Sequence, residues 1–234
     1  MSTAAGNDWL RVEGLAAGYG KAVVLNEIDL AVAQGSVVGI AGANGVGKTT
    51  LLRALTGVLP RSRGTVTLDG QPVPSSPLRV TRMGIVHVPE GRQLFANLTV
   101  RENLRLGAIA RGVKNRAAAI DGLCDLFPTL PQFLPRKAGL LSGGQQQLVA
   151  VARGLVASPR LLFIDELSLG LSPVAATDIT TSAVSACRAH GATLVMVDQN
   201  LRLLARHCDI LRHVREGQLH PLSLEDVKSG AALF

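Results

Sequence analysis

Short apolar runs alternate with helical patterns along most of this chain. Runs rich in aliphatic and β-branched residues predict strands at 36–42, 85–88, 161–165 and 193–197. The last three runs contain no alternating polar residues, which is typical of strands covered on both faces. Because helical patterns separate these strands, the chain is predicted to form a layered α/β domain.

The first 70 residues follow a different pattern. The segments LRVEGL, VVLNEIDLAV and GTVTLDG alternate between apolar and polar positions, as expected for strands with one buried and one exposed face. Asp69-Gly70 is a hairpin turn signal. We therefore predict an antiparallel sheet near the N-terminus.

Between Gly91 and Leu140 the strand signal disappears. Thr99 and Glu102 have the spacing of a capping box at the start of a helical pattern, and a second helical pattern follows at 116–127. These features predict a helical insert.

Two further helices are predicted after the insert's proline-spaced segment. Ser142 is an N-cap candidate for a helix that runs through Leu155. Ser172-Pro173 opens another helix, which closes at Gly191. We predict one domain over residues 8–234, with a helical subdomain inserted at about 92–157.

Composition limits the possible classes of protein. A chain of 234 residues that is 47% hydrophobic can bury a core. No apolar run is long enough to cross a bilayer and the N-terminus lacks a secretory pattern, so a cytoplasmic location is predicted. The three cysteines show no metal-type spacing and are interpreted as small buried hydrophobic residues.

The net charge of +7 has three interpretations: nucleic-acid binding, an anionic membrane surface, or solubility alone. Aromatic residues make up only 3% of the chain, so few are present to stack on bases. We favour solubility and expect no nucleic-acid partner.

The segment GANGVGKT fits the phosphate-binding pattern G-x-x-x-x-G-K-[ST], with a predicted strand before it and an amphipathic helix after it. Glycines in such a loop let backbone N–H groups converge on phosphate, the lysine neutralises phosphate oxygens, and the threonine offers its hydroxyl to Mg²⁺. The candidate nucleotide-binding residues are Gly42, Ala43, Asn44, Gly45, Val46, Gly47, Lys48, Thr49 and Thr50.

The strand LLFIDE delivers two carboxylates at its C-terminal end, where open α/β sheets place their ligands. Asp165 is a candidate Mg²⁺ ligand together with Thr49, and Glu166 is a candidate for activating water. The alternative is a solvated acidic strand end that binds nothing. It would not explain why two acids close a fully apolar strand.

A second candidate phosphate site follows at Ser142, whose hydroxyl precedes two glycines and a helix. Together, GANGVGKT, the pentapeptide LSGGQ and the strand ending in Asp165-Glu166 resemble an ABC-type ATPase with a P-loop core. In that family the signature pentapeptide meets the γ-phosphate of ATP held by another subunit in a head-to-tail pair. The resemblance therefore adds these candidate nucleotide-binding residues: Leu141, Ser142, Gly143, Gly144 and Gln145.

The resemblance assigns further positions. Tyr19 stands where the family places an aromatic ring on adenine, although a ring at a core edge is the other interpretation. Glu90 and Gln199 stand where most relatives have glutamine and histidine. Glu90 is implied as a Mg²⁺ ligand beside the attacking water, and Gln199 as a neutral donor to the γ-phosphate. Gln199 cannot carry a proton near pH 7, which leaves the role of general base to Glu166 alone.

Three segments, 88–104, 168–173 and 197–200, resemble the ATP-binding subunits of branched-chain amino acid importers. Besides Glu90 and Gln199, two further positions differ from the common family pattern. Leu167 replaces a proline and gives up a fixed φ, which predicts a less restrained loop. Ser172 replaces an aspartate in the loop that crosses the dimer interface.

The resemblance implies an ATP-hydrolysing subunit, on the inner face of the membrane, that couples energy to import. The implied cofactors are ATP and Mg²⁺. The implied partners are integral membrane permease subunits, a homologous or identical ATPase subunit, and indirectly an extracytoplasmic substrate-binding protein. The alternatives are a urea or amide importer, or a soluble ABC ATPase acting on nucleic acid. A permease-docking surface is predicted at Arg92, Leu94, Phe95 and Leu98.

Overall fold

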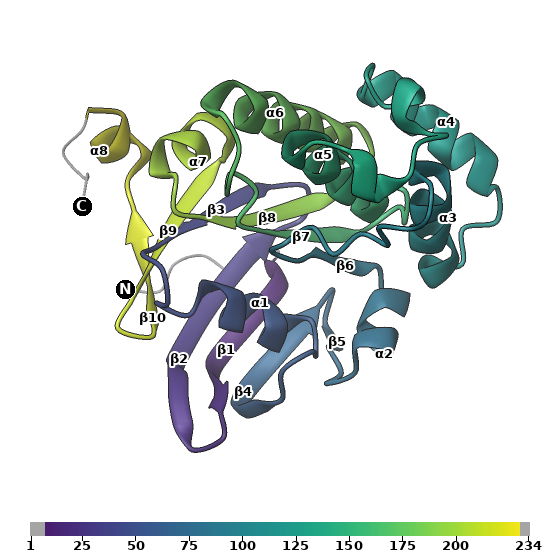
Figure 1. Cartoon of the computed structure of the whole chain (residues 1–234). Coiled ribbons are helices and arrows are strands. Elements are labelled where there is room, and N and C mark those ends of the chain that lie inside the picture. The colour runs from purple at the N-terminus through teal and green to yellow at the C-terminus, as the bar shows by residue number, and fades with distance from the viewer. Residues whose placement is uncertain (1–7, 230–234) are drawn as a thin grey trace.

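The computed structural model describes residues 8–229, so the last five residues of the predicted domain lie outside the described part. Two sheets form the framework (Figure 1). The first is antiparallel, with the order β2-β1-β4-β5. Its strands are β1 (Asp8–Tyr19), β2 (Ala22–Ala33), β4 (Arg61–Leu68) and β5 (Gln71–Pro72). The antiparallel sheet predicted near the N-terminus is confirmed.

The second sheet has six strands in the order β10-β9-β3-β8-β7-β6. Its first five members along the chain pair in parallel, and only the edge strand β10 is antiparallel. The strands are β3 (Val37–Ala41), β6 (Ile85–Val88), β7 (Leu161–Asp165), β8 (Thr193–Asp198), β9 (Ile210–Arg215) and β10 (Gln218–Leu222).

Each central strand of the second sheet is buried on both faces. In β7, Leu161 and Phe163 face one hydrophobic cluster, whereas Leu162 and Ile164 face the other. Successive side chains of a strand point to opposite faces, so an uninterrupted apolar run lets one strand contribute to both clusters. The lack of alternating polar residues at 161–165 therefore correctly predicted a strand buried on both faces.

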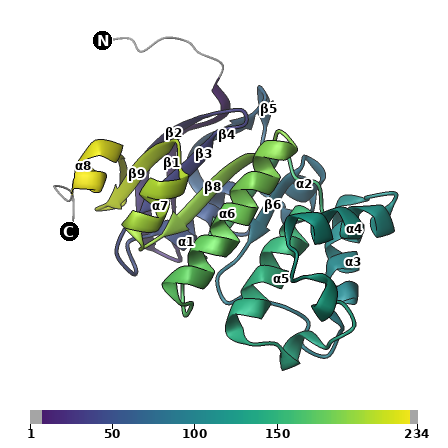
Figure 2. The same ribbon diagram turned by 90° about the horizontal axis from the view of Figure 1, so that it is seen from above.

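Helices cover the two faces unequally (Figures 1 and 2). Helix α1 (Lys48–Leu55) lies between the two sheets and contacts strands of both. Helices α5 (Gly143–Leu155), α6 (Pro173–Ala189) and α7 (Leu201–His207) cover the opposite face of the six-stranded sheet. Two shorter helices are α2 (Pro77–Arg82) and α8 (Leu224–Ser229).

The chain between β6 and β7 is helical, as the sequence predicts. It holds α3 (Val100–Arg111), α4 (Arg116–Leu126), two 3₁₀ turns at Pro131–Phe133 and Ala138–Leu140, and α5. The capping box at Thr99 and Glu102 is present in α3. Figure 2 shows α3 and α4 at one end of the molecule, beside α5.

Candidate nucleotide site

The carboxyl ends of β3, β6, β7 and β8 meet at one edge of the sheet, since these strands run parallel. A cavity of about 260 Å³ opens at this edge. It brings together predicted residues from four separate parts of the sequence. The lining residues are Asn44, Gly45, Gly47, Lys48, Thr49, Thr50, Glu90, Glu166, Leu169 and Gln199.

The GANGVGKT loop has the conformation that phosphate binding requires. Gly45 and Gly47 have φ of 77° and 110°, values that glycine adopts readily and other residues rarely adopt. Helix α1 begins directly at Lys48, and no side chain caps its first turn. Its leading N–H groups are therefore available to an anion at the positive end of the helix dipole.

Lys48 and Glu166, which both line the cavity, form a buried ion pair. The Lys48 Nζ lies 2.9 Å from Glu166 Oε1, and the side chains are 4% and 8% exposed. The ammonium also donates to the carbonyls of Gly42 and Ala43. Glu166 itself has φ of 49°, a strained value for a residue other than glycine and one that is concentrated at functional sites. A phosphate that reaches Lys48 must compete with Glu166.

Asp165 fits the predicted role of a cation ligand. Its carboxylate is fully buried, its Oδ1 accepts a hydrogen bond from Thr49 Oγ1 at 3.2 Å, and its Oδ2 has no hydrogen-bond partner. Burial, together with the negative charges of Glu166 and Glu90, raises the pKa of this carboxyl to about 6, although the Thr49 hydrogen bond and Lys48 act to lower it. An unpaired buried carboxylate oxygen beside a hydroxyl is suited to a bound cation.

Protein side chains do not complete a metal site by themselves. Across residues 8–229, no group of three or more His, Cys, Asp or Glu side chains is arranged to hold a metal ion. Mg²⁺ usually takes only one or two protein carboxylates and fills its remaining positions with water and substrate phosphates. Asp165, Thr49 and Glu90 fit a metal ion that arrives with a nucleotide and polarises its phosphates.

Gln199 lies beside the other predicted catalytic groups. Its amide nitrogen donates to Asn44 Oδ1 in the phosphate loop and lies 3.4 Å from Glu166 Oε2. The amide therefore joins the phosphate loop to the candidate base.

Sequence reasoning missed Asp198, the residue before Gln199. It is buried, and its carboxylate accepts hydrogen bonds from the backbone and hydroxyl of Ser168 and from the backbone of Asn200. Asp198 thus holds the loop after Glu166 against the loop that carries Gln199. The sequence signal that could have identified Asp198 is its position at the end of an apolar strand, which Asp165 shares.

The loop after Glu166 is more restrained than the Leu167 replacement predicts. Leu167 is buried in the hydrophobic cluster beneath α5 and α6, and Ser168 is held by Asp198. Burial of an apolar side chain therefore restrains this loop instead of a proline ring. Ser172 caps α6 by accepting from the backbone N–H of Ala175.

The signature segment lies outside the nucleotide cavity. Ser142 and Gln145 form a reciprocal capping box at the start of α5. Ser142, Gly144 and Gln145 line a different cavity, of about 520 Å³, between the helical segment and α6. The two cavities have no lining residue in common, so within one chain the two candidate phosphate sites are separate.

Tyr19 does not line the nucleotide cavity. It ends β1 and is 46% exposed, and its hydroxyl accepts a hydrogen bond from Arg53 of α1 at 3.1 Å. The ring is accessible and tied to the helix that follows the phosphate loop. Stacking on adenine stays a prediction.

The predicted docking residues have different surroundings. Phe95 is 55% exposed and lines a groove of about 410 Å³ bounded by α2, β6, α3 and α5. The fully buried Asn103 fixes this position, because its amide bonds both the N–H and the carbonyl of Phe95. Arg92 does not line this groove; its guanidinium donates to Gln146 Oε1 of α5.

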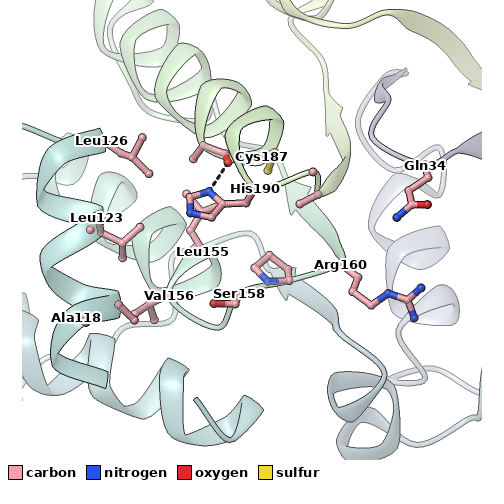
Figure 3. Close-up of a pocket in the computed structure, with 16 residues that line it drawn as sticks. Gln34, Ala118, Leu123, Leu126, Leu155, Val156, Ser158, Arg160, Cys187 and His190 are labelled. Atoms are coloured by element: carbon pink, nitrogen blue, oxygen red, sulfur yellow. Dashed lines mark hydrogen bonds between the residues drawn. The ribbon is translucent and has the colours of Figure 1, made fainter. Parts of the chain in front are cut away.

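A further cavity of about 440 Å³ lies where α4 meets the core. Figure 3 shows Leu123 and Leu126 of α4 on one side, Gln34 and Arg160 on the other, and His190, after α6, between them. Its wall includes Arg160 and Ala192, the residues directly before β7 and β8. This cavity is therefore at the amino ends of the strands, opposite the nucleotide cavity.

These observations define the class of protein: a P-loop nucleotide-binding fold with a second candidate phosphate site, at Ser142, outside the nucleotide cavity. A family model described as ABC transporter matches residues 25–168. Two curated relatives are a branched-chain amino acid transport ATP-binding protein BraG of Pseudomonas aeruginosa and a probable LivF protein of Archaeoglobus fulgidus. The first is 35% identical over 86% of both chains, and the second is 36% identical over 82% of both chains.

A solved structure of an ATP-binding cassette of an ABC transporter superposes with a TM-score of 0.85, at 28% identity, over 96% of this chain and 95% of that chain. The chain belongs to the ABC transporter family, as an ATP-binding subunit. It is an ATPase, with ATP and Mg²⁺ as its cofactors. Within the described residues, no helix is both long and apolar enough to cross a membrane.

The groove that carries Phe95 also contains a histidine with a pH-dependent effect on stability. Burial and the charge of Arg53 lower the pKa of His87 from 6.5 to about 4. Since the unfolded chain binds a proton that folded His87 resists, the free energy of unfolding falls as pH drops from about 6.5 to 4. The variant His87→Gln should remove on the order of 2–3 kcal/mol of that loss.

Denaturant unfolding at pH 4.5 and 7 measures this effect, with the exposed His220→Gln as the matched control. If His87→Gln and His220→Gln lose stability equally on acidification, the buried neutral imidazole is not the cause.

Proposed function

We propose that this chain is the energy-coupling ATPase of an importer for branched-chain or other hydrophobic amino acids. It would bind, from the cytoplasm, to integral membrane permease subunits supplied by other chains. An extracytoplasmic substrate-binding protein would deliver the substrate to those permease subunits. The names of the two curated relatives support the substrate class, and the groove that carries Phe95 supports a permease partner.

The observation that carries the proposal is the rigid presentation of Phe95. An exposed aromatic ring is normally free to move, but this one stands on a loop pinned by a buried asparagine. Val58 and Leu106 are also exposed beside the same groove. A fixed apolar groove suits an amphipathic helix from a partner protein.

In the proposed reaction, Lys48 and the first N–H groups of α1 bind the β- and γ-phosphates. Glu166 takes a proton from the attacking water, and Gln199 donates a hydrogen bond to the γ-phosphate. Displacement of Glu166 from Lys48 by the incoming phosphate frees the carboxylate for this role. ATP binding and activation of the base are then one event.

The two separate phosphate-type sites support a nucleotide sandwich between two subunits. Ser142 and the glycine amides of α5 would bind the γ-phosphate held by the partner's phosphate loop, since a helix N-terminus favours an anion. The partner would be either a second copy of this chain or a homologous subunit.

A docking variant tests the importer assignment. Phe95→Asp should lower co-purification with the permease subunits at least about tenfold, because a charge replaces a buried aromatic anchor at the interface. The matched control is Val23→Asp, an exposed apolar position in β2, which should co-purify normally. Capture of ribosomes or DNA in place of a permease would favour the soluble ATPase alternative.

Urea or short amides are the other substrate class that the resemblance allows. Uptake measurements in cells that lack this chain separate the two classes. Loss of leucine or valine uptake supports the proposal, whereas loss of urea uptake alone rejects its substrate class.

A further inference from the structure

Arg92 follows closely after a residue of the chain's own nucleotide cavity. Its side chain, however, contacts the signature segment, which is proposed to bind the nucleotide of the partner subunit. Arg92 lies two residues after the candidate Mg²⁺ ligand Glu90. Its side chain crosses to α5, where Nη1 donates to Gln146 Oε1 at 3.2 Å. The contact joins the loop after β6 to the first turn of the signature helix.

The guanidinium also lies over the signature glycine itself. A Cβ placed on Gly143 would be 3.0 Å from Arg92 Nη2 and 3.4 Å from Cζ. A Cβ on Gly170, in the loop after Glu166, would be 3.8 Å from the same Nη2. One cation therefore reaches two glycines that belong to different motifs. Glycine at 143 leaves the room that the planar group occupies.

The backbone around Arg92 is held independently of its side chain. Gly91, Arg92 and Gln93 have φ of 78°, 63° and 45°, so three successive residues adopt the left-handed region. Arg153 of α5 donates to the carbonyls of Gln93 and Arg92 at 2.8 and 3.2 Å. Removing the Arg92 side chain therefore leaves the loop anchored to α5 by Arg153.

The charge of Arg92 is not balanced within the described chain. Among residues 8–229, no carboxylate forms an ion pair with its guanidinium. The group also lies at the N-terminus of α5, where the helix dipole is positive and a cation is disfavoured. An anion that docks on the signature turn would relieve both conditions.

We propose that Arg92 is a positioning residue for the nucleotide bound by the partner subunit. Its side chain orients the first turn of α5 and adds positive charge where the partner's γ-phosphate arrives. It therefore serves the opposite site, although its neighbour Glu90 lines the chain's own cavity. This inference rests on the nucleotide sandwich in the proposed function.

A pair of complementary variants isolates a single composite site. A Lys48→Ala chain that also carries Glu166→Gln, so that no unpaired carboxylate is left buried, cannot bind its own ATP but offers an intact signature turn. A Ser142→Arg chain binds ATP but offers a blocked turn. When mixed, they form one working site, from the phosphate loop of the second and the signature of the first. Phosphate release from the mixture should exceed that from either chain alone.

Arg92→Ala is then added to one chain at a time. In the Lys48→Ala chain, which donates the signature, it should lower phosphate release about tenfold or more, since misplaced catalytic groups cost this much. In the Ser142→Arg chain it should change the rate less than about twofold. A general loss of stability would lower activity in both arrangements, so the asymmetry is specific to the proposed role.

Two further variants sharpen the result. Arg92→Lys in the signature-donating chain should recover part of the rate, because it restores the charge but not the planar fork. Arg116→Ala, at the exposed start of α4, is the matched control for loss of a cation and should have no effect in either chain.

The outcomes separate the inference from the proposed function. If the parent mixture shows no gain over its components, the sandwich is wrong and the role of Arg92 is rejected with it. If the mixture gains activity but Arg92→Ala acts only in the ATP-binding chain, or in neither chain, the role of Arg92 alone is rejected.

Discussion

Replacing Glu166 with glutamine is expected to lower ATP hydrolysis by about 10²–10⁴-fold, the usual scale for loss of a general base. Glutamine keeps the size of the side chain but cannot accept a proton from water near neutral pH. ATP binding should persist or become tighter, because Lys48 no longer has a carboxylate that competes with phosphate. The measurements are phosphate release and the binding of a fluorescent ATP analogue.

The Glu166→Gln variant also tests whether bound ATP holds two subunits together. With Mg-ATP and no hydrolysis, Glu166→Gln should be recovered as a dimer, either with itself or with a homologous ATPase subunit. Glu216→Gln, an exposed acid in the β9–β10 turn, is the control and should hydrolyse ATP at the unmodified rate. Normal turnover by Glu166→Gln would exclude Glu166 as the base.

Replacing Lys48 with methionine is expected to have two separable effects. ATP affinity should fall by more than about 100-fold, since a charged donor to the phosphates is removed. The free energy of unfolding without nucleotide should also fall by about 3–5 kcal/mol, because Glu166 is left buried without its partner.

The double variant Lys48→Met, Glu166→Gln separates these effects. A neutral amide in place of the unpaired carboxylate should recover most of the lost stability, but it should not recover ATP affinity. Denaturant unfolding and nucleotide titration of the four proteins complete a double-mutant cycle. If Lys48→Met unfolds at the same denaturant concentration as the unmodified protein, Lys48 and Glu166 are not paired before ATP binds.

Long apolar runs and capping residues made much of the fold predictable. The run at 161–165 predicted a strand buried on both faces, and Ser142 predicted the start of α5. Helices α2 and α7 were missed because six or seven residues carry too little periodicity to be recognised. Strand β10 was also missed; it contains Pro221, which is tolerated at the edge of a sheet.

The candidate site was predicted only where its residues form a local sequence pattern. The phosphate loop is one contiguous segment, and Asp165 and Glu166 are neighbours at the end of a strand, so the local sequence alone identified each of them. Asp198 and Asn103 were not identified, because each acts by bonding a loop whose position depends on the fold. The contact of Arg92 with Gln146 was also not predicted, since the direction of a long side chain is not encoded in local pattern.

The sequence by itself determined the elements whose chemistry is local: strands, helix caps, the phosphate loop and the acids at a strand end. Only the tertiary structure decided which of these groups meet, because parallel strand pairing places Lys48, Glu90, Glu166 and Gln199 around one cavity and leaves Ser142 outside it. Ion pairs and loop clamps require distances of a few ångströms between residues far apart in the chain. Such distances are set by packing of the whole domain.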